Sequence, residues 1–172
     1  MSNKNTIKEA REKKVFQSFL ATRGLDGKFE SRQPPDPDIF YEHPELGSIA
    51  FELVEICAEE VKSEVSKLLK SNDDVCFIRS GHEPHKQVFS KLSKQYVSEY
   101  PIELLCYIGG MEILPTDVII SQIEHFISNS GTGFFQKIWV FDGSEIYCFD
   151  KKGNNRNFIE NQEKANNVSY YA

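Results

Sequence analysis

Residues 33–57 read QPPDPDIFYEHPELGSIAFELVEIC, and this stretch is the clearest indication of the fold in the sequence. Each proline fixes its own φ and constrains the residue before it, so residues 33–37 cannot form a helix. The apolar residues that follow predict a short strand over 38–42 and a longer, largely buried strand over 48–57. Because the intervening residues 43–47 predict a turn, we expect the two strands to form a hairpin.

Glu52 is a charged residue in the middle of the second strand of this hairpin. Side chains alternate between the two faces of a strand, so Glu52 lies on the opposite face from Phe51 and Leu53. A carboxylate that is buried alone costs several kcal/mol, and it therefore needs a cation, a metal ion or hydrogen-bond partners. An Mg²⁺ ion shared with Asp38 would meet this need through hard oxygen ligands, and an ion pair with a lysine or arginine would meet it equally.

Helices and strands alternate over the rest of the chain. A helix over residues 5–21 is predicted by an apolar stripe that contains Val15, Phe16 and Phe19, and Glu12 falls on the same stripe. Apolar periodicity also predicts helices over 59–71, 84–99 and 116–129, and strands over 75–78, 102–108, 137–141 and 145–149. The order α-β-β-α-β-α-β-α-β-β favours an α/β fold with a central mixed sheet whose faces are covered by helices.

The chain has 172 residues, 40% of them hydrophobic, which is enough for one domain with a buried core. We expect a single α/β domain over 1–150 and a polar, loose tail over 151–172. No run approaches the ~18 apolar residues needed to span a bilayer, and the charged N-terminus lacks a secretory apolar segment. These features predict a cytoplasmic protein without a membrane partner. The four cysteines have no CxxC spacing and are expected to be buried thiols.

The net charge of −6 is distributed unevenly along the chain. Residues 1–33 carry eight basic and four acidic groups, whereas residues 34–60 carry eight carboxylates and no lysine or arginine. Such an acidic cluster repels phosphates unless a cation lies in it, although most charge runs are simply solvated. The pattern therefore fits either a solvated surface or a divalent-metal site flanked by basic elements that bind a polyanion.

Pro37-Asp38, followed through a turn by Phe51-Glu52-Leu53-Val54-Glu55, resembles the motif of the PD-(D/E)xK, or restriction-endonuclease-like, nuclease superfamily. The preceding residues 30–38 are similar to the lead-in found in divergent, uncharacterised bacterial branches of this superfamily. The motif covers residues 30–57, and the element order extends the resemblance to about residue 108. The resemblance implies an α/β fold with an αβββαβ-type core.

What the resemblance implies is a hydrolase: a metal-dependent nuclease that cleaves phosphodiester bonds of nucleic acid, with DNA as the default substrate. Asp38 and Glu52 match the two metal-ligand positions of the motif, and the cofactor would be Mg²⁺ or Mn²⁺. In such a site the metal neutralises the scissile phosphate and activates water. Some members add a glutamate from the first helix, and Glu12 has the corresponding position here.

One position departs from the superfamily pattern, which places a lysine two residues after the second acidic residue. Neither Val54 nor, in a shifted register, Cys57 is a lysine. In some branches the lysine lies on a neighbouring helix, and the predicted helix 84–99 offers Lys91 or Lys86 for that role. The resemblance thus implies Lys91 and Glu12 as the catalytic residues beside the metal.

Two other functions stay open at the level of sequence. A decayed site on the same fold would make the chain a non-catalytic binding or protein-interaction module, which the missing lysine at position 54 and the single basic residue in 101–150 favour. An accessory protein could instead form a homodimer through an exposed apolar segment, for example around Phe134-Phe135. A live site binds Mg²⁺ or Mn²⁺ through Asp38 and Glu52, whereas a self-associating protein changes size with concentration.

Overall fold

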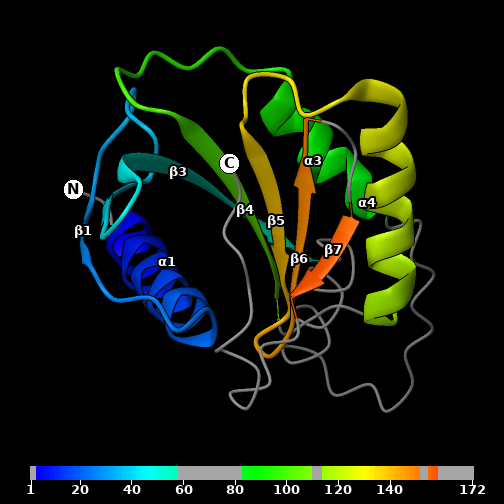
Figure 1. The fold of residues 1–172 in the computed structure, drawn as a ribbon, viewed down its shortest axis with the longest axis horizontal. Coiled ribbons are helices and arrows are strands. Elements are labelled where there is room, and N and C mark those ends of the chain that lie inside the picture. The colour runs from blue at the N-terminus through cyan, green and yellow to red at the C-terminus, as the bar shows by residue number, and fades with distance from the viewer. Residues whose placement is uncertain (1–2, 58–82, 110–113, 152–154, 159–172) are drawn as a thin grey trace, which may run out of the picture.

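A computed structural model describes residues 3–57, 83–109, 114–151 and 155–158 of the chain (Figure 1). Its centre is a seven-stranded mixed sheet with helices on both faces. The strands are β1 (Lys28–Ser31), β2 (Ile39–His43), β3 (Gly47–Ile56), β4 (Ile102–Ile108), β5 (Lys137–Phe141), β6 (Ile146–Asp150) and β7 (Asn155–Phe158), and the helices are α1 (Asn3–Thr22), α3 (Pro84–Leu92) and α4 (Thr116–Ser130). This arrangement confirms the predicted α/β fold with a central mixed sheet flanked by helices.

The strands lie in the sheet in the same order as in the sequence, from β1 to β7. The two hairpins β2–β3 and β5–β6, both expected from the turns between them, are antiparallel. The central strands β3, β4 and β5 are parallel, so the chain crosses over between them. The second crossover contains α4, and α3 lies within the first. A parallel centre with antiparallel edges therefore gives the sheet its mixed character.

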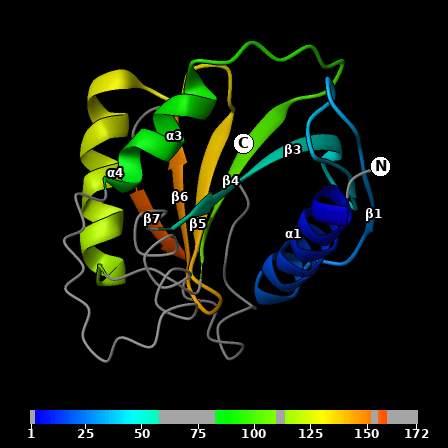
Figure 2. The ribbon, with the colours of Figure 1, turned by 180° about the vertical axis from the view of Figure 1, so that it is seen from behind.

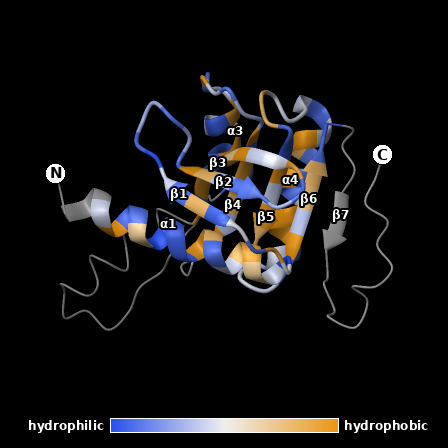
Figure 3. Cartoon of the chain, turned by 60° about the vertical axis from the view of Figure 1, so that its left-hand side comes forward, coloured by the Kyte–Doolittle hydropathy of each residue, from blue (hydrophilic) through white to orange (hydrophobic). Residues whose placement is uncertain are grey.

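Helix α1 covers one face of the sheet, and α3 and α4 cover the other (Figures 1 and 2). Phe16 and Phe19 of α1 are fully buried, and their rings pack edge-on against Phe51 of β3 and Trp139 of β5. Aromatic rings bury large areas, so these contacts supply much of the free energy that holds α1 on the sheet. Figure 3 shows the resulting alternation of hydrophobic and hydrophilic residues along α1. The apolar stripe predicted for this helix is therefore its packing face.

The opposite face of the sheet has a separate, mainly aliphatic core. Ile119, Ile123 and Ile127 of α4 are buried at the spacing of one helix face, and they pack over the inward residues of β4 and β5. Val88 of α3 belongs to the same core. Because β3, β4 and β5 are covered on both faces, their sequences are nearly continuous apolar runs in which any charged residue is conspicuous.

Two boundaries differ from the sequence-based expectation. Strand β1 was not predicted, since its four residues carry no apolar alternation strong enough to indicate a strand. Helix α3 ends at Leu92 instead of residue 99. Tyr96 continues the helical spacing, yet it packs into the same core from the loop, with its ring 5.4 Å from that of Phe135. Tyr96 therefore has the spacing of a further helical turn, although it lies in the loop after α3.

Several expectations fall partly outside the described residues, including the helix over 59–71, the strand over 75–78 and Cys76. The other three cysteines, Cys57, Cys106 and Cys148, are buried thiols as expected. Strand β7 lies within the segment expected to be a loose tail. Within the described ranges, no helix has the length and apolar character that crossing a membrane requires.

Candidate functional site

The candidate site lies where β2 and β3 separate. The two strands pair from the turn as far as Ile39 opposite Phe51, and β3 then continues alone on that side to Ile56. Asp38, immediately before β2, bridges the start of this gap. Its Oδ2 accepts a hydrogen bond of 2.8 Å from the backbone N–H of Leu53. The carboxylate is thereby fixed beside the part of β3 that carries Glu52.

Glu52 is buried, as the strand pattern predicts, with a residue exposure of 7%. It lies on the face of the sheet that α3 covers, and its Oε1 is 2.5 Å from Nζ of Lys91. The Lys91 side chain is itself only 14% exposed. This close ion pair joins two positions 39 residues apart and satisfies the need of Glu52 for a cation.

Helix α1 brings a second pair of charges to Asp38. Nζ of Lys8 lies 3.0 Å from Oε1 of Glu12 and 3.7 Å from Oδ1 of Asp38. Glu12 is 6% exposed, in agreement with its place on the apolar stripe. Lys8 was not predicted, although its position four residues before Glu12 puts it on the same helix face. We call Lys8, Glu12, Asp38, Glu52 and Lys91 the carboxylate–lysine cluster.

The members of the carboxylate–lysine cluster influence one another's protonation. Burial raises the pKa of Glu12, and the charge of Asp38 raises it further, while Lys8 and Lys91 oppose the shift. Burial lowers the pKa of Lys8, but Asp38, Glu12 and Glu52 together outweigh it, so the net change is upward. A raised pKa for both Glu12 and Lys8 is expected where neighbouring carboxylates outnumber the cations. Additional positive charge would therefore be stabilising at this site.

Tyr96 adds an unusual polar group beside Glu52. Its hydroxyl group is buried and close enough to the Glu52 carboxylate to act as its hydrogen-bond donor, although no bond of good geometry forms within the described residues. Burial raises the pKa of Tyr96, and the nearby charge of Glu52 raises it further. The proton therefore stays on the phenol at neutral pH, where the hydroxyl can donate to the Glu52 carboxylate.

The donor set suits a hard divalent cation. Within the described residues, no three His, Cys, Asp or Glu side chains form a group that could hold a metal ion as they stand. Mg²⁺, however, is commonly bound by only one or two carboxylates, with water and substrate phosphate completing its shell. Asp38, immediately before β2, and Glu52 of β3 provide two such carboxylates. The residues therefore fit an Mg²⁺ or Mn²⁺ ion of this kind, once Glu52 shares its charge with the metal.

Lys86, the other lysine considered for the catalytic role, and two further polar side chains lie away from the carboxylate–lysine cluster. Lys86 is exposed and pairs with Glu83 at 3.0 Å, so Lys91 is the lysine of α3 that reaches Glu52. His85 packs against the ring of Phe126 on α4. Glu55 points to the opposite face from Glu52 and pairs with an arginine of α1.

The aromatic pair considered for dimerisation divides between surface and core. Phe134 is 57% exposed, whereas Phe135 is fully buried against the second core. A single exposed ring is a common surface feature and defines no interface by itself. The pair therefore adds no functional site to the carboxylate–lysine cluster.

The repulsion at Glu12 has a measurable consequence for stability. Its raised pKa means that the folded state binds this proton more tightly than the unfolded state does. The stabilisation is present at low pH, below the ordinary carboxyl range, and is lost as the pH rises through the raised pKa. Glu12→Gln should therefore increase the free energy of unfolding at neutral pH, by up to about 1 kcal/mol because loss of the ion pair with Lys8 offsets part of the gain. The gain should disappear near pH ~4, where Glu12 is protonated.

Urea unfolding at the two pH values measures this difference. Glu9→Gln is the matched control, because Glu9 lies one turn away on α1 and pairs with Lys13 outside the carboxylate–lysine cluster. It should change stability little at either pH. An equal effect of Glu12→Gln at both pH values would show that Glu12 experiences no net repulsion in the folded protein.

The carboxylate–lysine cluster has to be interpreted from its own chemistry. No protein-family model, curated protein or solved structure matches this chain. The arrangement itself consists of three carboxylates and two ammonium groups, which come from β3, the residue before β2, and helices α1 and α3 on the two sides of the sheet. Its net charge is negative, its centre is partly buried, and the Tyr96 hydroxyl lies beside Glu52.

Proposed function

We propose that this chain is a nuclease-like phosphodiesterase of the PD-(D/E)xK type, dependent on Mg²⁺ or Mn²⁺, with DNA as the default substrate. The observation that carries the proposal is the convergence of Asp38, Glu52 and Lys91 where β2 and β3 separate. Their sequence positions are far apart, and a buried glutamate beside a partly buried aspartate and a partly buried lysine is the kind of charge group that is enriched at functional sites. Glu12 and Lys8 from α1 complete the site on the other side.

The order of elements supports the same assignment. From the N-terminus, the described residues give α1, β1, β2, β3, α3 and β4, the order of the αβββαβ-type core that the motif implies. The missing motif lysine has a substitute as well. Val54 packs toward the core beneath α3, and Lys91 reaches Glu52 from α3 on this same face. We propose that this ammonium group takes the part of the motif lysine from a different position in the sequence.

Each residue has a distinct part in the proposed reaction. Asp38 and Glu52 would hold the divalent ion, which when bound neutralises the scissile phosphate and lowers the pKa of water. The backbone N–H of Leu53 fixes the Asp38 carboxylate through its hydrogen bond. Lys91 carries a positive charge at Glu52 and is positioned to donate a hydrogen bond to a phosphate oxygen. Glu12 pairs with the Lys8 ammonium group, which in turn contacts the Asp38 carboxylate and helps to position it.

A non-catalytic binding module on the same fold is the second candidate. The observation in its favour is the close pair of Lys91 and Glu52, which neutralises both buried charges without a metal. The absence of lysine at position 54 points the same way. Such a module would keep the fold and the acidic surface but would bind no divalent ion.

Cleavage distinguishes the two candidates. Plasmid DNA and single-stranded DNA are incubated with the purified chain and Mg²⁺ or Mn²⁺, and parallel samples contain EDTA. The nuclease assignment predicts cleavage that requires the metal. No cleavage of either DNA at high protein and metal concentration would favour the binding module.

Lys8 provides a further test of the metal position. Its ammonium group lies 3.7 Å from Asp38, where it competes with a bound cation for the carboxylate. Lys8→Ala should therefore tighten Mn²⁺ binding by up to about fivefold, which corresponds to at most ~1 kcal/mol for a half-exposed charge. Calorimetric titration with Mn²⁺ measures the change.

Lys13→Ala is the control for this substitution. Lys13 pairs with Glu9 at 3.0 Å on the same helix, with the same spacing of four residues, but belongs to no part of the carboxylate–lysine cluster. Its removal should leave the Mn²⁺ affinity unchanged. Weaker binding by Lys8→Ala would mean that Lys8 supports the cation site instead of competing with it.

A further inference from the structure

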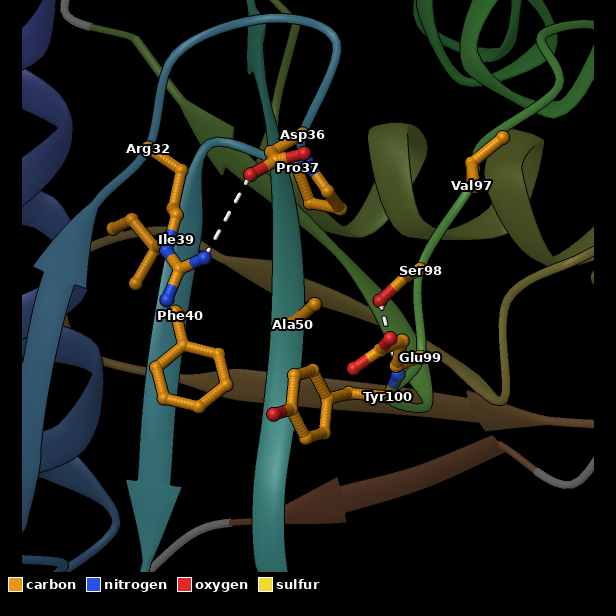
Figure 4. Close-up of a pocket in the computed structure, with 10 residues that line it drawn as sticks. All are labelled: Arg32, Asp36, Pro37, Ile39, Phe40, Ala50, Val97, Ser98, Glu99 and Tyr100. Carbon is orange, nitrogen blue, oxygen red and sulfur yellow. Dashed lines mark hydrogen bonds and ion pairs between the residues drawn. The ribbon is translucent and has the colours of Figure 1, made fainter.

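A pocket of about 290 Å³ adjoins the carboxylate–lysine cluster on the α3 side of the sheet (Figure 4). It is built from three segments: the β1–β2 connection with β2, one residue of β3, and the loop that leads from α3 to β4. Pro37, which precedes Asp38, lines it, and so does Ala50, which lies on the same face of β3 as Glu52. Two residues along a strand span about 7 Å, so pocket and cluster are neighbours. The volume is at the lower end of the ~300–1,000 Å³ typical of small-molecule sites.

The wall of the pocket consists of flat groups. The rings of Phe40 and Tyr100 lie 5.0 Å apart in an edge-to-face arrangement, which leaves both faces of the edge-on ring uncovered by its partner. The Arg32 guanidinium lies 4.8 Å from the centre of the Phe40 ring (Figure 4). Tyr100 is 39% exposed although it is a large aromatic residue. Such a surface suits a planar, partly apolar ligand that can stack.

The charges of the pocket argue against a phosphate as its occupant. Arg32 is its one cation among the lining residues, and both Glu30 and Asp36 already neutralise it. Asp36 and Glu99 add negative charge to the rim. Carboxylates instead accept hydrogen bonds from amino groups, as they do from the exocyclic amine of a base. The small side chain of Ala50 leaves an apolar floor beneath these groups.

We propose that this pocket binds an unpaired nucleobase of a single strand whose neighbouring phosphate lies at Asp38 and Glu52. The inference rests on the proposed nuclease function and adds to it the class of substrate, single-stranded or locally opened nucleic acid. Stacking on Tyr100 and Phe40 supplies the affinity and tolerates different bases, because every base has a π-face. Base pairing would keep the base in the duplex and out of the pocket.

Binding in EDTA tests the pocket without any cleavage. Fluorescence anisotropy measures the affinity of the full chain for a labelled single strand, for the same strand with abasic sites, and for the duplex. The proposal predicts tighter binding of the base-bearing strand than of the other two. Tyr100→Ala should weaken single-strand binding by about five- to a hundredfold, the range of one base stacked on an aromatic ring, and Tyr100→Phe should retain it.

Phe134→Ala is the control, because Phe134 is an exposed aromatic residue that does not line the pocket. Equal affinity for base-bearing and abasic strands, unchanged binding by Tyr100→Ala, or no binding of the single strand would overturn the proposal. Competition by a nucleoside monophosphate as effective as the strand would also overturn it, since the pocket would then serve a free nucleotide. Base-dependent binding together with a lack of metal-dependent cleavage would instead reject the nuclease function and leave the pocket intact.

Discussion

Asp38→Asn is expected to reduce metal-dependent cleavage on the order of a hundredfold or more, with little change in folding. The substitution removes the negative charge that would hold the divalent ion. It retains a carbonyl oxygen that can accept the hydrogen bond from Leu53, so the gap between β2 and β3 stays bridged. Initial cleavage rates measure the first effect, and urea unfolding measures the second. Asparagine is preferable to alanine, which would leave the Leu53 N–H without its acceptor.

Asp117→Asn is the matched control for this prediction. Asp117 is exposed in the first turn of α4, on a helix that contributes no member of the carboxylate–lysine cluster. The same loss of one negative charge there should leave cleavage unchanged. Equal cleavage by parent and Asp38→Asn would remove Asp38 from the mechanism, whatever the behaviour of the control.

Lys91→Met is expected to destabilise the metal-free protein and also to slow cleavage. Removing the ammonium group leaves the carboxylate of Glu52 buried without its partner at 2.5 Å. Breaking a buried ion pair in this way costs about 3–5 kcal/mol, and the residual exposure of Lys91 places the expected loss at the lower end. Methionine keeps the length of the side chain, so the effect reports the charge more than the packing. Urea unfolding of the metal-free protein measures it.

The second substitution Glu52→Gln tests the cause. In the Lys91→Met background it removes the unpaired charge, and it should restore much of the lost stability. Lys94→Met is the control, because Lys94 is exposed three residues further along the chain. A destabilisation by Lys94→Met as large as that by Lys91→Met would exclude the ion pair as its source.

Cleavage separates the structural role of Lys91 from its proposed part in the reaction. At saturating Mg²⁺ the ion itself compensates Glu52, so Lys91→Met should fold normally under these conditions. A rate that remains well below that of the parent, with metal affinity unchanged or increased, would indicate a direct part in phosphate binding. A rate equal to that of the parent would mean that Lys91 only forms the structural ion pair with Glu52.

The sequence predicted the fold well where one pattern had one explanation. The prolines at 34, 35 and 37 exclude a helix, and the apolar run after the turn could only be a buried strand. Glu52 was conspicuous because a buried carboxylate in such a strand needs a cation, a metal ion or hydrogen-bond partners. The stripe of α1 was equally clear, and it carried Glu12 into the buried face.

Other features depend on tertiary contacts that a linear pattern does not contain. Tyr96 fits the period of α3, yet the loop that begins at Ser93 carries it back into the core. Lys8 gains its importance only through Asp38, which lies 30 positions further along the chain. The pocket beside the cluster joins Phe40 to Tyr100, and no local spacing relates these two rings. The sequence therefore predicted which carboxylates belong to the candidate site, whereas only the structure shows all the side chains that lie beside them.

Binding of Mn²⁺ tests directly whether Asp38 and Glu52 form a divalent-cation site. Calorimetric titration of Mn²⁺ into the parent, Asp38→Asn and Glu52→Gln measures affinity and stoichiometry without any assumption about a substrate. We expect saturable Mn²⁺ binding by the parent, and we expect both substitutions to abolish it while the variants remain folded by circular dichroism. Mn²⁺ binding of the same affinity in parent and variants, or no binding by the parent, would contradict it.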